Sequence, residues 1–289
     1  HSSKWEALVT RDPSLLKQLY RDMEAKGSQP KEGYFEDVLE NLVPGLEKIM
    51  FSGGETLYQK AHYKFLDAIP AEHAAHIQLH YVTNGTINSL GGWDLVSIWR
   101  KFRGVMVLVS TDGVGERFEY FRVGANWKQV EKNIRHWCAN LIGFRLHCEI
   151  TCSAYQMFYL SETLDYLYDN QLGDAITASM VQYPPVLNAR IIPPETKLRI
   201  KADWEYYLQG IADEKKKEAV LRIGQPCIDY MMGSNLDIYD LPGGVLPTWR
   251  DFERQARKMD SLFKTRIEQA FPRVAETFSQ DVVQGSIQA

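Results

Sequence analysis

The sequence predicts an α/β fold in which parallel strands alternate with helices. Apolar runs of strand length recur along the chain, each run ends in polar residues, and a helix-like segment follows each of them. These polar ends are Gly53-Gly54-Glu55, Thr83-Asn84-Gly85 and Ser110-Thr111-Asp112. Glu55, Asn84 and Asp112 are 29 and 28 residues apart, which is the length of one strand, one helix and two short loops. Ligands of parallel α/β proteins bind at the C-terminal ends of strands, so these residues predict one site.

Hydrophobic periodicity and capping residues place the elements of this fold in order. We expect strands at 48–52, 77–82, 105–110, 144–153 and 175–182. We expect helices at 59–69, 93–101, 127–139 and 161–169, the last two capped by Asn126 and Ser161. The strands lack a clean alternation, as strands covered on both faces do. Right-handed crossovers between such strands give either a parallel barrel or an open sheet.

The two ends of the chain are predicted to be helical. Asp12-Pro13 begins one helix, which Gly27 ends, and residues 34–46 form a short helical approach to the first strand. After Pro193-Pro194, which should break the chain, we expect a helix around 204–211 and another at 214–222. Thr248 then caps an amphipathic stretch whose apolar face is formed by Trp249, Phe252, Ala256, Met259, Leu262, Phe263, Ile267 and Ala270.

Composition excludes several classes of partner. The chain has 289 residues, a net charge of −4 and 45% hydrophobic residues, which is typical of an ordinary globular protein and argues against nucleic acid or an anionic membrane as partner. No apolar run approaches the ~20 residues that span a bilayer. The four scattered cysteines predict reduced thiols and a cytoplasmic location, and Cys148 and Cys152 fit buried thiols better than half of a metal motif.

The residues at the strand ends suit a zwitterionic ligand. Gly53 and Gly54 let a ligand approach the backbone, and the Glu55 carboxylate can accept hydrogen bonds from an ammonium group; the alternative is a tight turn. Ser110 and Asp112 share a strand face and suit a ribose or an amino acid. Arg122 follows, either to meet a ligand carboxylate or as a surface residue.

Other chemistries receive less support from the sequence. His80, His147 and Glu149 form either a metal site or a hydrogen-bonded polar pair low in the fold. No lysine follows a strand, which disfavours Schiff-base chemistry, and no Gly-x-Ser-x-Gly elbow is present, which disfavours an α/β-hydrolase.

The order and spacing of the strand-end motifs resembles radical S-adenosylmethionine (radical SAM) enzymes, and within them the twitch-domain branch related to the peptide-modifying SPASM proteins. The motifs that carry this resemblance are Ser52-Gly53-Gly54-Glu55-Thr56-Leu57, Thr83-Asn84-Gly85-Thr86, Ser110-Thr111-Asp112-Gly113-Val114-Gly115-Glu116-Arg117 and Tyr120-Phe121-Arg122. Pro193-Pro194-Glu195-Thr196-Lys197 and Phe271-Pro272 are also similar to that branch.

The resemblance implies a partial (β/α)6 barrel over residues 1–190 and a mainly helical region over 191–289 that covers the barrel mouth. It implies that Gly53, Gly54 and Glu55 hold the methionine amino group of SAM. Ser110, Asp112 and Arg122 would lie near the ribose and carboxylate of SAM. Thr83 and Asn84 would line the same cavity.

The implied reaction is reduction of SAM at a four-iron four-sulfur (4Fe-4S) cluster, which yields a 5′-deoxyadenosyl radical. This radical would abstract hydrogen from a substrate, here a peptide or protein, and the electron would come from a flavodoxin or ferredoxin. The cofactor would carry the chemistry, and the protein would bind, orient and exclude water.

Two departures from the family pattern affect this hypothesis. Thr56 replaces the proline that usually follows Gly-Gly-Glu, and the cluster-binding C-x3-C-x2-C loop is absent from the sequence. We expect that loop, with the first strand, to precede His1, so that the chain alone would be inactive and would hold no complete auxiliary cluster. The alternatives are a metal-dependent α/β-barrel hydrolase or lyase, and a non-catalytic scaffold that binds SAM or a nucleotide.

Overall fold

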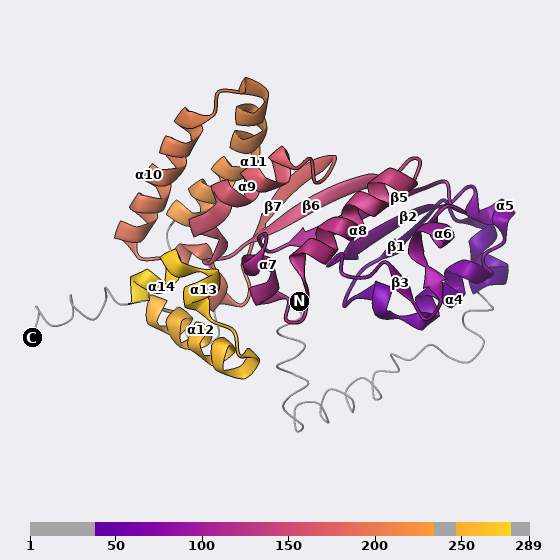
Figure 1. Cartoon of the computed structure of the whole chain (residues 1–289), viewed down its shortest axis with the longest axis horizontal. Helices are drawn as coiled ribbons and strands as arrows, with labels where there is room; N and C mark the ends of the chain where they lie inside the picture. The colour runs from indigo at the N-terminus through magenta and orange to yellow at the C-terminus, as the bar shows by residue number, and fades with distance from the viewer. Residues whose placement is uncertain (1–37, 234–246, 279–289) are drawn as a thin grey trace, which may run out of the picture. The chain divides into compact units, whose positions relative to one another are not determined.

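The computed structural model describes residues 38–233 and 247–278 (Figure 1). The chain divides into two compact units. The first comprises residues 1–110 and 121–147, and the second comprises residues 111–120 and 148–289. The helix predicted from Asp12 to Gly27 lies outside the described residues. The predicted division after residue 190 falls within the second unit.

A five-stranded parallel sheet confirms the α/β class. Its strands are β1 (Lys48–Phe51), β2 (Gln78–Thr83), β5 (Gly104–Thr111), β6 (Arg145–Cys152) and β7 (Ala175–Met180). Their order in the sheet, β1-β2-β5-β6-β7, follows their order in the chain, as successive βα units produce. All five predicted strands are confirmed, with ends that differ by no more than a few residues.

In the first unit, short helices and a hairpin accompany β1, β2 and β5. They are η1 (Val38–Leu42), η2 (Val43–Gly45), η3 (Thr56–Tyr58), α4 (Lys60–Ala68), α5 (Ala71–Ala74), the hairpin β3–β4 (Ser89–Leu90 and Trp93–Asp94), α6 (Leu95–Trp99) and α8 (Trp127–Asn140). The register pairs Phe51 with Tyr81 and Thr83 with Val109. Tyr81 lies against Phe51 and Trp99, with ring centroids 5.0 and 5.1 Å apart, so aromatic side chains fill much of this core.

One helix of this unit is shorter than predicted. The expected helix at 93–101 is confined to Leu95–Trp99. Gly91 and Gly92 have positive φ angles of 57° and 93° and reverse the chain, so that Trp93 pairs back with Leu90 in a hairpin. Asp94 then begins α6, because its carboxylate accepts a hydrogen bond from the Ser97 amide at 2.8 Å.

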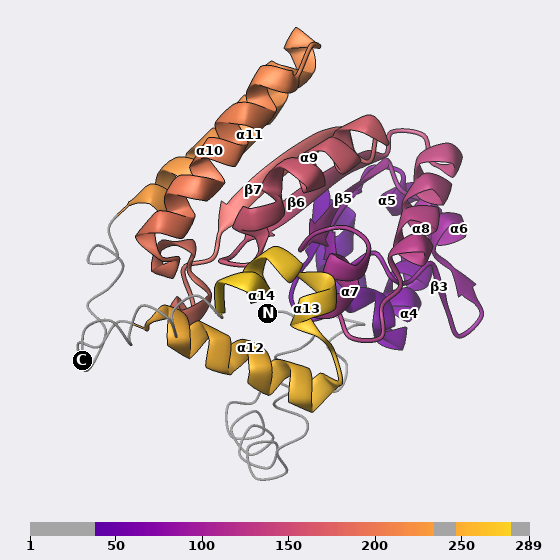
Figure 2. The ribbon, with the colours of Figure 1, turned by 60° about the vertical axis from the view of Figure 1, so that its left-hand side comes forward.

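In the second unit, helices precede, follow and contact β7. They are α7 (Glu116–Phe121), η4 (Gln156–Tyr159), α9 (Leu160–Asp169), η5 (Pro185–Leu187), η6 (Ala189–Ile191), α10 (Pro194–Gly210), α11 (Glu214–Met232), α12 (Trp249–Phe263), α13 (Ile267–Ala270) and α14 (Pro272–Phe278). The long helix α11 packs against β7, α9 and α10, and Figures 1 and 2 both show α10 and α11 side by side.

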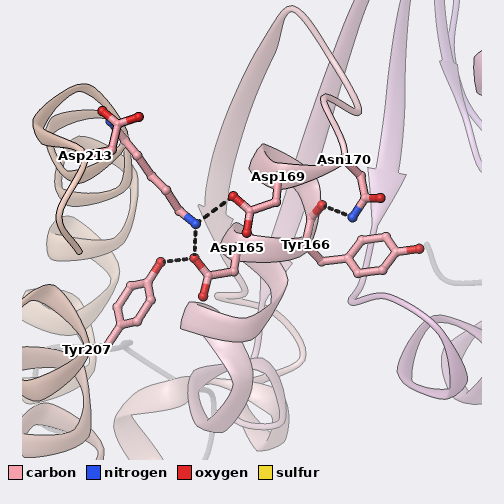
Figure 3. A network of polar contacts seen from close by, with 7 residues as sticks. Asp165, Tyr166, Asp169, Asn170, Tyr207 and Asp213 are labelled. Carbon is pink, nitrogen blue, oxygen red and sulfur yellow. Dashed lines mark hydrogen bonds and ion pairs between the residues drawn. The ribbon is translucent and has the colours of Figure 1, made fainter. Parts of the chain in front are cut away.

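A charged network joins three of these helices (Figure 3). The Lys216 ammonium of α11 lies 2.7 Å from carboxylate oxygens of both Asp165 and Asp169 of α9. The Tyr207 hydroxyl of α10 donates a hydrogen bond of 2.7 Å to Asp165. Lys216 therefore belongs to a contact between helices.

Several predicted helix ends in the second unit are wrong. Ser161 does not cap α9, because the turn η4 runs directly into the helix and leaves Tyr159 at the N-cap position. Pro193-Pro194 does not interrupt the structure, since Pro194 is the first residue of α10. An N–H at that position has no partner within the helix, so a proline is tolerated there. The helix predicted at 214–222 continues through Pro226 to Met232, because Val220, Cys227, Ile228 and Met231 are buried.

The C-terminal amphipathic stretch is confirmed in its face and in its cap. The side chain of Thr248 accepts a hydrogen bond from the Asp251 amide, and the Asp251 carboxylate accepts one from the Thr248 amide at 2.8 Å. The helix ends at Phe263 because Lys264 adopts a left-handed φ of 55°, so the stretch continues as the separate helices α13 and α14. No helix within residues 38–233 and 247–278 combines the length and apolar character needed to cross a bilayer.

Candidate functional site

The carboxylate of Glu55 lies where the C-terminal ends of β1 and β2 meet. Its Oε1 accepts hydrogen bonds from the Thr83 hydroxyl at 2.8 Å and from the Leu57 amide at 3.3 Å. Its Oε2 accepts a hydrogen bond of 2.8 Å from the Asn84 amide. The predicted meeting of Glu55 with Thr83 and Asn84 is therefore confirmed within the first unit, and the bond to Leu57 makes Glu55 the N-cap of η3.

Three donors leave part of the carboxylate available. An ionised carboxylate offers about four acceptor positions, so three protein donors leave roughly one for a ligand. Glu55 is half-buried rather than enclosed, and Gly53 and Gly54 before it are exposed. Both glycines have positive φ angles, 86° and 42°, and no atom lies within 4 Å of a Cβ built on Gly53. The loop therefore presents bare backbone beside an incompletely satisfied carboxylate.

The turn after β2 is held by its own side chains. The Asn84 Oδ1 accepts hydrogen bonds from the Thr86 amide at 3.0 Å and from the Thr86 hydroxyl at 2.6 Å. The Gly85 amide donates to the Thr83 hydroxyl oxygen at 3.1 Å, and Asn133 of α8 donates to the Gly85 carbonyl at 2.9 Å. These bonds fix the direction of the Asn84 amide that meets Glu55. The Thr-Asn-Gly-Thr sequence is the signal for this turn, since Asn and Thr side chains bond to nearby backbone amides.

The pKa of Glu55 is raised above its ordinary value of 4.5. The main cause is desolvation by burial, which disfavours the charged form. The hydrogen bonds from Asn84, Thr83 and Leu57 and the positive charge of Arg122 act in the opposite direction. Burial outweighs them, so the surroundings disfavour the charged form of Glu55, and an added ammonium group would stabilise that form.

Arg122 and Ser110 are the other predicted site residues of the first unit. Both are half-buried, and the influence of Arg122 on Glu55 places its guanidinium within electrostatic range of the carboxylate. Thr83 pairs with Val109, so Ser110 is the next residue along the neighbouring strand. Ser110 thus lies at the same edge of the sheet as Glu55, Thr83 and Asn84, and Arg122 lies within electrostatic range of Glu55.

Asp112 belongs to the second unit and follows the end of β5 at Thr111. It is buried, with 7% of its surface exposed, and its carbonyl accepts a hydrogen bond of 2.8 Å from the Gln156 side chain. Thr111 is anchored in the same unit by a hydrogen bond of 3.0 Å from its hydroxyl to the Glu149 carbonyl. Gln156 is a residue that the sequence did not single out, because it lies in the turn η4 that was not predicted.

The described residues contain no group of three or more His, Cys, Asp or Glu side chains placed to hold a metal ion. This includes His80, His147 and Glu149, the set predicted as an alternative metal site. His80 is half-buried, and desolvation, with smaller effects of Lys48 and His147, lowers its pKa.

The cysteines do not provide a cluster site either. Cys148, Cys152 and Cys227 are buried and Cys138 is exposed, which confirms the prediction of buried thiols for Cys148 and Cys152. The Cys148 thiol donates to the Leu172 carbonyl at 3.1 Å. Cys152 and Cys227 hydrogen-bond to each other, and this bond together with burial raises the pKa of Cys152.

Comparison with known proteins identifies no family. No protein-family model matches the chain, and no curated protein matches it.

Proposed function

We propose that this chain binds the amino-acid part of S-adenosylmethionine at Glu55 and forms the SAM-binding part of a radical SAM enzyme. The observation that carries the proposal is the Glu55 carboxylate, held by three protein donors at the ends of two adjacent parallel strands with about one acceptor position left. The finer fold in this proposal is a partial (β/α)6 barrel, of which the five parallel strands would be part.

Each site residue has a role in binding the methionine end of SAM. Glu55 accepts hydrogen bonds from the ammonium group, and the exposed Gly53 and Gly54 let the ligand lie against the backbone. Arg122 supplies a positive charge for the ligand carboxylate, and Ser110 supplies a hydroxyl at the neighbouring strand end. Thr83 and Asn84 orient Glu55 rather than reach the ligand themselves, because the Thr83 hydroxyl and the Asn84 amide already donate to its carboxylate.

The residues present fit SAM but do not fit a 4Fe-4S cluster. A cluster needs closely placed thiolates, and three of the four cysteines are buried in contacts of the second unit. A cluster held outside these residues would supply the reductive chemistry, with a flavodoxin or ferredoxin as the proposed electron donor and a peptide or protein as the proposed substrate. For this chain alone we propose binding without cleavage.

Calorimetric titration of the full chain with SAM tests the proposal. We expect saturable binding of SAM and little binding of 5′-methylthioadenosine, which has the nucleoside but no amino-acid group. Glu55→Gln should weaken SAM binding by tenfold or more, because a charge-assisted hydrogen bond is worth about 1.5–3 kcal/mol. Glu72→Gln, at an exposed position of α5, is the matched control and should bind as the unmodified chain does.

Two results would overturn this assignment. Absence of SAM binding, or equal binding by Glu55→Gln, excludes Glu55 as the ammonium acceptor. Equal affinity for 5′-methylthioadenosine favours a nucleotide-binding scaffold that does not recognise the amino acid. A third measurement addresses the radical reaction: dithionite and reconstituted iron and sulfide should yield no 5′-deoxyadenosine with this chain alone.

A further inference from the structure

A half-open cavity of about 200 Å³ lies within the second unit, far along the chain from the Glu55 site. It is bounded by η4 and the start of α9, by α10, by α11 and by α14. Its floor is apolar and consists of the buried side chains of Met157, Phe158, Leu160, Ile200, Trp204 and Ile228. Pockets for drug-sized ligands measure about 300–1,000 Å³, so this cavity suits a smaller molecule.

The mouth of the cavity is polar and charged. Arg199, Asp203 and Glu276 line it and are exposed, while Ser161 and Arg273 are half-buried. An apolar floor below a small number of polar groups is the usual composition of a small-molecule site. A ligand of matching chemistry has an apolar body and a polar head.

Three of these charged side chains have no partner among residues 38–233 and 247–278. In the part of the chain that the structure describes, the side chains of Arg199, Asp203 and Glu276 form no hydrogen bond or ion pair. This holds although Arg199 and Asp203 are four residues apart on α10, a spacing at which opposite charges often pair. Arg273 differs, because it forms an ion pair with Glu162 and its guanidinium lies 4.1 Å from the centre of the Tyr159 ring.

We propose that this cavity binds a free α-amino acid with a large apolar side chain. The side chain would occupy the floor, the ammonium group would bind Asp203 and Glu276, and the carboxylate would bind Arg199. Two carboxylates and one guanidinium without a partner among the described residues match a head group that carries both charges. The inference goes beyond the proposed function, since none of the lining residues belongs to the Glu55 site.

Calorimetry of the full chain with L-leucine and L-phenylalanine, without SAM, tests this inference. We expect saturable binding of both, with glycine at least tenfold weaker because it lacks the side chain. N-acetyl-leucine and leucinamide should each bind at least tenfold more weakly than leucine, since each removes one charge of the head group. Leucinamide that binds as tightly as leucine would overturn the amino-acid assignment and point to an apolar amine.

Substitutions of residues that line the cavity test whether leucine binds there. Arg199→Gln should weaken leucine binding by about tenfold or more, because it removes a charged hydrogen bond to the leucine carboxylate. Arg222→Gln, at an exposed position of α11 outside the cavity, is the matched control. Ser161→Leu places a larger side chain at the mouth and should abolish binding, while a thermal melt shows that the variant is folded. Glu55→Gln should bind leucine as the unmodified chain does, so that failure of the SAM proposal and failure of the leucine proposal can be told apart.

Unchanged leucine binding by Arg199→Gln and Ser161→Leu would place the ligand elsewhere and overturn the proposal. Equal binding of glycine and leucine would do so too, because the apolar floor would then play no part.

Discussion

At the residue scale, Glu55 illustrates how a half-buried carboxylate can serve as both a structural link and a ligand acceptor. It joins the ends of two strands through three hydrogen bonds, yet its pKa remains above 4.5 because burial outweighs those bonds. Compared with the unfolded chain, the folded protein therefore binds the Glu55 proton more tightly. The resulting contribution of Glu55 to stability is largest below the pKa of the unfolded state and is lost as the pH rises through the pKa of the folded state.

This direction of the Glu55 shift predicts how SAM affinity depends on pH. Binding an ammonium group requires the charged carboxylate, so affinity should fall as the pH is lowered through the raised pKa of Glu55, by up to about tenfold per pH unit. The fall should begin at a higher pH than for an ordinary glutamate. Titrations with SAM between pH 7 and pH 4 measure it, a range that extends below the ordinary glutamate value of 4.5. An affinity that is constant over this range in the unmodified chain would contradict the assigned role.

His62 predicts a pH dependence of stability in the first unit. It is 6% exposed, its Nε2 lies 2.8 Å from the Tyr81 hydroxyl oxygen, and desolvation lowers its pKa from 6.5 to about 4. The folded state thus favours neutral His62. This contribution to the free energy of unfolding is present above pH 6.5 and is lost as the pH falls toward 4. The full loss corresponds to about 3 kcal/mol.

Urea unfolding at pH 7 and pH 5 measures this effect. His62→Phe should reduce the difference in unfolding free energy between the two pH values. The variant also loses the hydrogen bond between His62 and Tyr81, but this loss is the same at both pH values. His136→Gln, which removes an exposed histidine, controls for the loss of a histidine as such. Should His62→Phe keep the full difference, the burial of a neutral His62 would not be its source.

At the element scale, the contact between α10 and α11 depends on one glycine. Trp204 of α10 lies over Gly224 of α11, and its indole nitrogen donates a hydrogen bond of 2.9 Å to Gln225. A Cβ added to Gly224 would lie 2.7 Å from Cζ2 and 2.9 Å from Cζ3 of Trp204, and closer still to Cη2. No side chain fits there unless the helices or the indole move.

Gly224→Ala should therefore destabilise the protein, by about 1–3 kcal/mol, which is the typical cost of overpacking. Gly210→Ala is the matched control, because Gly210 is also helical and no atom lies within 4 Å of its added Cβ. That control should be neutral or slightly stabilising, since alanine is the better helix former. Chemical denaturation of both variants gives the comparison, and similar effects in the two would contradict the close approach of Trp204.

At the scale of the whole molecule, the sequence predicted the strands better than the connections between them. The five strands are apolar runs of the right length, and that signal is local. Helix α8 was predicted to within one residue at its end, since Asn126 caps it through a bond to the Gln129 amide. The hairpin at 89–94, the turn η4 and the continuation of α11 past Pro226 depend on tertiary packing, which single-residue propensity does not contain.

In the candidate site, too, the sequence predicted some contacts and missed others. That Glu55 would meet Asn84 followed from topology, because the C-terminal ends of adjacent parallel strands share one edge of the sheet. The donor Leu57 was less accessible to prediction, because its bond to Glu55 depends on how the loop after β1 turns. The cavity with Arg199 and Asp203 had no sequence signature, since its walls come from four separated segments.

The division of the chain into units means that neither unit is one continuous stretch. The segment 111–120 belongs with residues 148–289, although residues 121–147 of the other unit separate them. Phe271 packs on Tyr120, with ring centroids 5.3 Å apart, and Gln269 donates to Glu116 across 153 positions of sequence. On the ribosome, this early segment must therefore wait for almost the entire remaining polypeptide to be translated before its final neighbours exist.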